Sequence, residues 1–352
     1  MPRHTVAAVL IVRDEALHLR RALDSVRPWT DRLVVVDTGS RDDTPAIARA
    51  AGAEVSHMVW CDDFSQARNT ALDRANADWH LVLDGDEWLA RGGETLAALR
   101  HQRPDFVGAL QVDSRFGAEG AATRVAASWI SRVLPGHVRY AGRVHEQPQH
   151  HLPIRRLPVR VDHDGYAEAA LQRKAGRNAS LLLRALQDQP EDAYLWYQLG
   201  KDHDVYRRHA EALDCFDRAE ARLGDAHPPW LHDLCVRRLH ALKCCGRHAD
   251  GLDRASAEMD RWTHSPDFHF ALGDLLLDWA ASEPRHAGTL LPMIESAWLR
   301  CLEIGERPDL EGAVQGRGSH LARHNLRVLQ QFSGELGGIG QPDPAHPARQ
   351  PA

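Results

Sequence analysis

Residues 79–87 read WHLVLDGDE, an apolar run that ends abruptly in three acidic side chains around one glycine. Similar apolar runs alternate with helix-like stretches through the first part of the chain, in the order 6–12, 15–26, 32–36, 44–51, 54–60 and 65–75. This alternation predicts parallel βαβ units and therefore an α/β domain. Ligands of such sheets bind at the carboxyl ends of the strands, so the residues after each run are candidate site residues.

The bulk composition excludes several classes of protein. The chain has 352 residues, enough for two domains, and a net charge of −6 from 43 basic and 49 acidic residues. This balance provides no positive field for phosphates, so we expect no nucleic-acid partner. Val6–Val12 is too short for a signal peptide or a membrane span, and no later run approaches about 18 apolar residues. We predict a soluble, cytoplasmic protein without integral membrane contact.

Cysteines and histidines give no composition-level signal for a metal. The six cysteines form neither paired CxxC motifs nor a disulfide lattice, and the 22 histidines are scattered. Cys244 and Cys245 are adjacent within an apolar helical pattern, which predicts buried, reduced thiols.

The second half of the chain has a helical pattern. Before it, short β-like runs predict the antiparallel, acceptor-facing half of the first domain, at 107–112, 129–134 and 159–161. Residues 193–224 then match the spacing of the roughly 34-residue tetratricopeptide (TPR) repeat, at Trp196, Leu199, Gly200, Ala212, Phe216 and Ala219. Gly200 and Ala212 would let two helices approach, while Trp196 and Phe216 fill the space between them.

Weaker copies of the repeat follow at 239–259 and 268–304, where Leu272-Gly273 corresponds to Leu199-Gly200. Fewer than three clean repeats are marginal alone, so we expect the array to pack on the first domain. The predicted organisation is an α/β domain over residues 1–170, a helical repeat domain over 171–332 and a disordered tail over 333–352.

D-x-D triplets occur at 84–86, 162–164 and 202–204. The last lies within the repeat helix, where we expect a solvated face. Asp84 and Asp86 instead end an apolar run, and residues i and i+2 of an extended loop project to the same side. Two such carboxylates repel unless a cation joins them, and hard oxygen ligands suit Mg²⁺ or Mn²⁺. Because Gly85 lets the backbone approach a diphosphate, we predict a metal–diphosphate site rather than a plain acidic turn.

Three ordered motifs together resemble the family 2 glycosyltransferases: VVVDTGSxDxT at 34–44, FSxARN at 64–69 and LDGDE at 83–87. More narrowly, the chain is similar to bacterial members that fuse a GT-A domain to TPR repeats, including the glycocin-type peptide glycosyltransferases. The resemblance covers roughly residues 5–220, and GRVHE at 142–146 and HDGY at 163–166 also fit it. It implies a GT-A fold, a Rossmann-like mixed sheet flanked by helices, followed by an all-α TPR-like domain.

The resemblance also implies roles for individual residues. Asp37 would accept a hydrogen bond from the nucleobase, and Arg68 would flank the base or the diphosphate, although it could be an ordinary helix-surface arginine. Asp86 and His163 would bind the metal, with imidazole suiting Mn²⁺ better than Mg²⁺; a structural or exposed histidine is the alternative for His163. The donor-binding set implied is Val12, Arg13, Glu15, Asp37, Arg68, Asp84, Gly85 and Asp86.

Glu146 is the predicted general base. Transfer with inversion needs a carboxylate near the anomeric carbon to take the acceptor proton. His145-Glu146 does not begin a zinc-protease motif, because Gln149 stands where the second histidine is needed and Pro148 would break the helix. The fallback carboxylates are Asp113 and Glu87.

Several alternatives remain open. Many relatives carry Asn-Glu-Glu where this chain has Arg13-Asp14-Glu15, which leaves the nucleotide contacts of this loop undefined. Asp162 and Asp164 compete with His163 as metal ligands. Sugar nucleotidyltransfer would require a glycine-rich loop after the first strand, and none is there. A TPR scaffold with a silent GT-A domain is the alternative of a different class.

The leading hypothesis is an inverting, metal-dependent glycosyltransferase that uses a nucleoside diphosphate sugar, expected to be UDP-linked, as donor. The acceptor would be a peptide, a protein or a glycan, guided by the TPR-like domain, with lipid-linked and polysaccharide precursors still open. A homodimer is one of the open oligomeric states.

Overall fold

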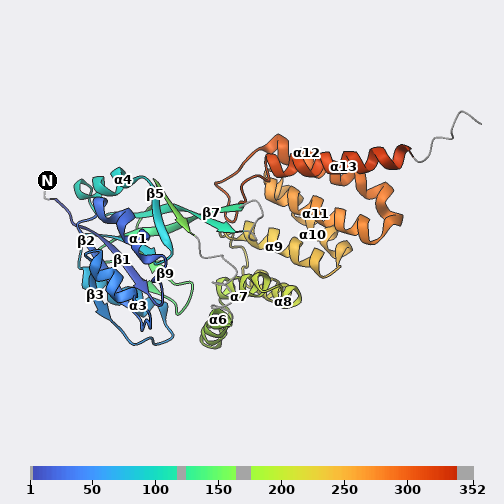
Figure 1. Cartoon of the computed structure of the whole chain (residues 1–352). Helices are drawn as coiled ribbons and strands as arrows, with labels where there is room; N and C mark the ends of the chain where they lie inside the picture. Colours follow the sequence, from blue (N-terminus) through green and yellow to red (C-terminus); the bar gives the residue numbers. More distant parts are fainter. Residues whose placement is uncertain (1–2, 117–123, 164–175, 339–352) are drawn as a thin grey trace, which may run out of the picture. The chain divides into compact units, whose positions relative to one another are not determined.

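The computed structural model describes residues 3–116, 124–163 and 176–338 of the chain (Figure 1). The chain forms two compact units, the first from Met1–Ala241 with Pro308–Val314 and the second from Leu242–Arg307 with Gln315–Ala352. The division therefore falls within the helical half of the sequence. The predicted boundary after residue 170 lies outside the described residues, and the predicted domain limits stay predictions.

The first unit is built on an eight-stranded mixed sheet. Across the sheet the strands are β3 (Glu54–His57), β2 (Arg32–Asp37), β1 (Val6–Val12), β4 (Trp79–Asp84), β7 (Arg124–Pro135), β6 (Val107–Phe116), β10 (Ile154–His163) and β5 (Glu87–Arg91). Strands β1 to β4 are parallel, and β7 is antiparallel to both of its neighbours. A separate small sheet pairs β8 (Arg139–Ala141) with β9 (Gln147–Gln149).

Helices cover both faces of the large sheet, as the strand periodicity requires. On one face, Ala8 and Leu10 of β1 share a core with residues of α1 (Leu19–Val26), α2 (Thr44–Ala50) and α4 (Gly93–Ala98). On the other face, Ala7 and Val9 pack with α3 (Phe64–Ala75). Short 3-10 turns complete this part, η1 (Arg27–Trp29) and η2 (Leu99–His101). The α/β, GT-A-like mixed sheet with flanking helices expected from the sequence is confirmed (Figure 1).

Two features of the sheet differ from the sequence expectation. Strand β5 was not expected, and it follows β4 after only a tight turn although the two are not neighbours in the sheet. The half after residue 107 is not wholly antiparallel, because β10 pairs parallel with β6 and antiparallel with β5. The antiparallel β10–β5 ladder matters for the site, since it sets His163 opposite Glu87.

The helical part of the first unit begins with α6 (Arg177–Asp188), α7 (Ala193–Val205), α8 (His209–Ala221) and α9 (Leu231–Cys244). Helices α7 and α8 form the predicted TPR-like pair. A Cβ atom added to Gly200 would lie 2.5 Å from Cε1 of Phe216, so the glycine is needed for this helix contact. Trp60 and Phe64, near the start of α3, pack with Leu181 and Leu195 in one core. The first helices of the array therefore pack on the α/β part within the same unit.

The second unit contains α10 (His248–Trp262), α11 (Pro266–Ser282), η3 (Pro284–His286), α12 (Ala287–Ile304) and α13 (His320–Gly338). A Cβ atom on Gly273 would lie 2.4 Å from Nε1 of Trp298, which repeats the glycine–aromatic contact of Gly200 and Phe216. The predicted weak copy at 268–304 therefore keeps the same packing device. Helix α13 runs into the segment predicted as a tail, whose residues 339–352 lie outside the described part.

Two local expectations were wrong. Asp202 and Asp204 do not form a solvated face: their side chains are only 7% and 8% exposed, because Arg208, His209 and Arg237 pair with them. Cys244 is exposed and Cys245 is intermediate, since they stand at the end of α9 rather than in its buried part. Within the described ranges, none of the helices has the length and apolar character that a membrane crossing requires.

Candidate active site

The candidate site lies where β1, β2 and β4 end, at one edge of the parallel part of the sheet. Register places Val12 beside Asp37 and Ile11 beside Asp84, so the three strands deliver their last residues to the same edge. This is the edge at which parallel sheets bind ligands. The following loops carry most of the residues predicted from the sequence.

The loops after β1 and β2 are tied together by polar contacts. Asp14, with a φ of 55°, donates its N–H to Oγ of Ser40 at 2.9 Å and accepts the N–H of Arg41 at 2.7 Å. Glu15 donates its N–H to Oγ1 of Thr44 at 2.8 Å. The backbone of the loop after β1 is therefore held by the DTGSRDDT segment, which gives that motif a structural role.

Asp37 ends β2 with a side chain that is 3% exposed. It accepts hydrogen bonds from the backbone N–H groups of Gly39 and Ser40, and from Nδ1 of His57 at 3.1 Å. Burial raises the pKa of Asp37, but the hydrogen bonds from Ser40 and His57 outweigh it and hold that pKa below its ordinary value. Asp37 is thus a fixed anionic acceptor at the strand end, as a role in binding a nucleobase N–H requires.

Asp84 is held by two arginines. Its carboxylate accepts hydrogen bonds from Nη2 of Arg68 at 2.7 Å and from Nη2 of Arg132 at 2.9 Å, yet the side chain stays 35% exposed. Burial opposes the charged form, but Arg132 and Arg68 hold the pKa of Asp84 well below its usual range. Asp84 therefore remains ionised and partly accessible while its position is fixed.

Arg132 is the functional candidate that sequence reasoning missed. It lies near the end of β7 and pairs with Glu87 at 2.9 Å as well as with Asp84. Glu87 is buried and accepts the backbone N–H of Asp84 at 2.9 Å, and burial raises its pKa although Arg132 opposes that shift. Glu87 therefore stabilises the D-x-D turn. Because its carboxylate is buried and already paired, it is poorly placed to serve as a base. An arginine within an apolar strand pattern was the available signal for Arg132.

Asp86 lies beside His163, which ends β10. The Oδ2 atom of Asp86 lies 3.4 Å from Nε2 of His163, whose Nδ1 lies 3.2 Å from Oγ of Ser114. Burial lowers the pKa of His163, but the hydrogen bond and charge of Asp86 raise it above its ordinary value. Two ligand atoms about 3.4 Å apart can bind one cation, since metal–ligand distances near 2.1 Å produce roughly that separation. The spacing of the Asp86 and His163 ligand atoms therefore fits a divalent cation.

Glu146 reaches the same group of charges from the segment before β9. Its side chain is 9% exposed and forms an ion pair with Nε of Arg68, so Arg68 bridges Glu146 and Asp84. The preceding residue, His145, has a φ of 51°, a turn that carries Glu146 toward α3. Arg68 is 7% exposed, which excludes the helix-surface alternative. Despite burial, Asp84 and Glu146 hold the pKa of Arg68 well above its ordinary value.

Gly85 packs closely on the first loop. A Cβ atom there would lie 2.9 Å from Cγ of Glu15 and 3.4 Å from Cγ1 of Val12, so these three predicted residues are neighbours. Arg13 is 45% exposed and lies 3.9 Å from Asp14. The structure thus gathers Val12, Glu15 and Gly85 at one point and leaves Arg13 at the rim.

The remaining acidic candidates are placed differently. Asp113 accepts from Nε2 of Gln111 at 2.7 Å, and Arg160 lies between Asp113 and Asp162 at 3.6 and 3.3 Å. Asp162 is buried, and Asp164 lies outside the described residues. Asp113 and Asp162 therefore both lie beside Arg160.

Comparisons with known proteins match this part of the chain. Residues 8–142 match the family described as Glycosyl transferase family 2. A TPR repeat-containing protein of Synechococcus elongatus is 38% identical over 211 residues, 55% of this chain and 51% of that protein. The SPbeta prophage-derived glycosyltransferase SunS of Bacillus subtilis is 27% identical over 218 residues, 60% of this chain and 52% of SunS. The chain spans about half the length of these curated relatives.

Among solved structures, a glucosyl-3-phosphoglycerate synthase from Mycobacterium tuberculosis is 23% identical, with a TM-score of 0.27. The match covers 32% of this chain and 45% of that one, which was solved with Mn²⁺, UDP and glucosyl-3-phosphoglycerate.

Proposed function

We propose that the protein transfers one sugar from a nucleoside diphosphate sugar with inversion at the anomeric carbon, because residues 8–142 match the family described as Glycosyl transferase family 2. The observation that carries this proposal is the joining of Asp84, Arg68 and Glu146 in one chain of ion pairs at the sheet edge. Asp86 and His163 lie beside that chain, with Glu87 bridging to Arg132. A candidate base and a candidate metal pair thus share one edge, as group transfer requires.

Asp86 and His163 are the residues proposed to hold Mn²⁺ or Mg²⁺. Their ligand atoms lie 3.4 Å apart, and Ser114 fixes the far nitrogen of the imidazole. A divalent cation bound there supplies positive charge that stabilises the departing diphosphate. A carboxylate with an imidazole favours Mn²⁺ over Mg²⁺, because Mg²⁺ prefers oxygen ligands.

The donor would lie across the ends of β1 and β2. Asp37 is a buried anionic acceptor for a base N–H, which favours uracil and hence a UDP-linked sugar. Arg13 stands at the rim, and burial together with the charge of Arg13 lowers the pKa of Arg177 at the start of α6. The charge of Arg13 would favour an anionic diphosphate at this rim.

Glu146 is proposed as the general base. The acceptor oxygen forms a bond to the anomeric carbon, the bond from that carbon to the diphosphate oxygen breaks, and the acceptor proton passes to the Glu146 carboxylate. Arg68 positions this carboxylate and couples it to Asp84. Attack from the face opposite the leaving diphosphate inverts the anomeric centre.

The acceptor is proposed to be a peptide, a protein or a glycan that approaches beside α7. The Nε2 atom of Gln147, next to Glu146, donates to Oη of Tyr194 in α7 at 3.1 Å, so the first helical pair borders the base. TPR-like helices commonly present a polypeptide-binding face, which favours a peptide or protein. A cytoplasmic location and a homodimer are also proposals.

Donor hydrolysis tests the proposed activity. The purified protein with UDP-glucose and Mn²⁺ is expected to release UDP slowly, and Asp86→Asn is expected to lower that release by at least about 100-fold. Asp105→Asn is the matched control, because Asp105 is an exposed carboxylate of the same domain, 62% exposed and 3.8 Å from Arg155. Absence of UDP release with every nucleotide sugar would favour a TPR scaffold with a silent GT-A domain.

A thermal-shift panel of nucleotide sugars, with and without Mn²⁺, identifies the donor. A ligand present at about 100 times its dissociation constant stabilises the folded state by about 2.7 kcal/mol, which raises the melting temperature measurably. We expect a UDP-sugar to give the largest metal-dependent rise. Equal shifts for adenine and guanine nucleotides would contradict the role proposed for Asp37.

Glu146→Gln separates catalysis from binding. It is expected to lower sugar transfer by about 10²–10⁴-fold, the usual contribution of a general base, while UDP affinity changes little. Single-turnover kinetics and calorimetric UDP titration measure the two quantities. An unchanged transfer rate would assign the base to another carboxylate.

A further inference from the structure

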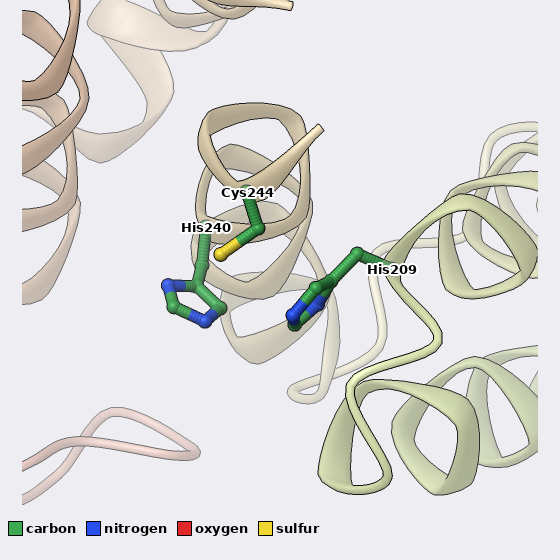
Figure 2. A group of neighbouring side chains, drawn as sticks. All are labelled: His209, His240 and Cys244. Carbon is green, nitrogen blue, oxygen red and sulfur yellow. The ribbon is translucent and has the colours of Figure 1, made fainter. Parts of the chain in front are cut away.

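We propose that His209, His240 and Cys244 form a zinc-binding site on the helical repeat array. In the described part of the chain, these three side chains bring two imidazoles and a thiol together, with their ligand atoms all within 4.8 Å of one another. Figure 2 shows His240 and Cys244 leaving the same side of one helix, with the His209 ring facing them from a neighbouring segment. The group is separate from the residues of the candidate active site.

Helix α9 sets two of the ligands. His240 and Cys244 are four residues apart in one unbroken helix, so they lie one turn apart on the same face. Helix geometry alone fixes this pair, since α9 continues through the position at which the two compact units divide. Both residues are exposed, so an ion can reach them from solvent.

The turn between α7 and α8 sets the third ligand. Arg207, with a φ of 58°, reverses the chain so that α8 begins at His209. The His209 and His240 rings meet edge to face, with centroids 5.6 Å apart. Both rings belong to the first compact unit, so this contact is internal to it.

Asp204 orients His209 for metal binding. Its Oδ1 atom lies 3.2 Å from Nδ1 of His209, and its Oδ2 atom accepts from Nη1 of Arg237 at 3.0 Å. A carboxylate paired with arginine only accepts hydrogen bonds, so in the neutral ring the proton of His209 lies on Nδ1 and Nε2 offers its lone pair to a metal. A carboxylate behind a ligating histidine is the usual outer-shell arrangement of zinc sites.

The ligand types select the metal. Two imidazoles and a thiolate suit Zn²⁺, whereas Mg²⁺ and Mn²⁺ prefer carboxylate oxygens. Ligand atoms of a tetrahedral zinc site lie roughly 3.5 Å apart, so rotation of exposed side chains is enough to close the present spacing. Three protein ligands leave the fourth position for water or a ligand from a partner. The bound ion would fasten the α7–α8 turn to α9.

Cobalt substitution tests this site in the full-length chain without a histidine tag, after EDTA treatment and in the presence of a reductant. Co²⁺ is expected to give the thiolate charge-transfer band and the visible bands of a tetrahedral site, both removed by one equivalent of Zn²⁺. Cys244→Ser is expected to lose the charge-transfer band and to weaken Zn²⁺ binding by about 100-fold or more. Cys245→Ser, the adjacent thiol outside the cluster, is the matched control and is expected to keep both.

Asp204→Asn tests the outer-shell role, with an expected loss of about 10- to 100-fold in Zn²⁺ affinity while the charge-transfer band remains. Circular dichroism of the metal-free variants checks that they fold. His209→Gln, which leaves the thiol intact, is the second ligand variant if Cys244→Ser is misfolded. Zn²⁺ binding of equal strength in wild type, Cys244→Ser and His209→Gln would overturn the proposal, as would a cobalt spectrum without a thiolate band.

Discussion

The chain contains two described D-x-D triplets whose surroundings differ, Asp84–Asp86 at a strand end and Asp202–Asp204 in the last turn of a helix. In both, the first aspartate pairs with arginine and the second lies beside a histidine. Asp86 meets His163 through Nε2 at 3.4 Å, so carboxylate and imidazole can bind one cation side by side. Asp204 meets Nδ1 of His209 instead and stands behind the ring.

The same D-x-D tripeptide therefore meets different partners in a strand end and in a helix. At the end of β4, the tight turn divides the two carboxylates, so that Asp84 meets Arg68 and Arg132 while Asp86 meets His163 at the end of β10. In α7, the helix turns the acids toward Arg208 and toward α9. The strand triplet thus offers a carboxylate directly to a ligand, while the helical triplet supports a histidine that offers the ligand atom.

Replacing the second aspartate of either triplet has the largest expected effect. Asp86→Asn is expected to lower UDP release by at least about 100-fold and to leave cobalt binding at Cys244 unchanged, because it removes a proposed ligand of the donor metal. Asp204→Asn is expected to keep UDP release and to weaken zinc binding. Steady-state UDP release and cobalt spectra on both variants measure this. Parallel loss of both activities in either variant would contradict the separation of the two sites.

The arginines beside the triplets differ in what depends on them. Arg132→Met leaves Glu87 and Asp84 without their shared cation, and removing one partner of a buried ion pair costs about 3–5 kcal/mol. Arg237→Met is expected to cost less, about 1–3 kcal/mol, because Tyr197 still donates to Asp233 at 2.6 Å and His209 still bonds Asp204. Urea unfolding measures both free energies. Equal costs would show that the strand network is no more sensitive than the helical one.

Histidines near the two triplets should respond differently to acid. Burial lowers the pKa of His80 in β4 to about 4. Between pH 6.5 and 4 the unfolded state therefore binds more protons than the folded state, and stability is lost as pH falls through that window. The full shift corresponds to about 3 kcal/mol. His80→Gln keeps an acceptor for the N–H of Ala77 and is expected to remove this part of the acid sensitivity.

His203→Gln is the control for this experiment. His203 lies within the helical triplet and is only partly buried; burial and Arg208 lower its pKa, while Glu211 opposes the shift. Its replacement is expected to change the pH dependence of unfolding less than His80→Gln does. Urea midpoints at pH 6.5 and 4.5 measure the difference. An equal fall of the midpoint with pH in wild type and His80→Gln would show that His80 does not cause the acid sensitivity.

The smallest expected effect concerns a glycine–aromatic contact that occurs once inside each unit. Gly200→Ala would place a methyl group against Phe216, and Gly273→Ala would do the same against Trp298. Overpacking of this kind costs about 1–3 kcal/mol. Thermal unfolding is expected to show similar losses for both variants. A neutral Gly273→Ala would mean that the second copy of the repeat is packed more loosely than the first.

Much of the fold could be predicted because its signals are local. Buried parallel strands are continuous apolar runs, so β1, β2 and β4 were found, and the TPR spacing located α7 and α8. Strand β5 was missed because it begins with Glu87, directly after the acidic triplet, and pairs with a strand some 70 residues later. A local sequence pattern predicts neither the pairing partner of β5 nor the parallel pairing of β10 with β6.

The site was predictable only in part, for a similar reason. The resemblance to family 2 glycosyltransferases with TPR repeats is confirmed by the family match and the relatives, and it pointed to Asp37, Arg68, Asp86 and Glu146. Arg132 escaped notice because it belongs to no motif and meets Asp84 only when β7 pairs with β4. The exposure of Cys244 also escaped, since an apolar helical pattern does not reveal where the buried face ends.

The proposed catalytic metal site consists of Asp86 and His163, which would bind a divalent cation that in turn binds the donor diphosphate. Calorimetric titration of UDP with and without Mn²⁺, on wild type and Asp86→Asn, tests it most directly. We expect Mn²⁺ to tighten UDP binding at least about tenfold in wild type, or about 1.4 kcal/mol, and not in the variant. Equal UDP affinity with and without Mn²⁺ in wild type, or an unchanged Mn²⁺ effect in Asp86→Asn, would contradict it.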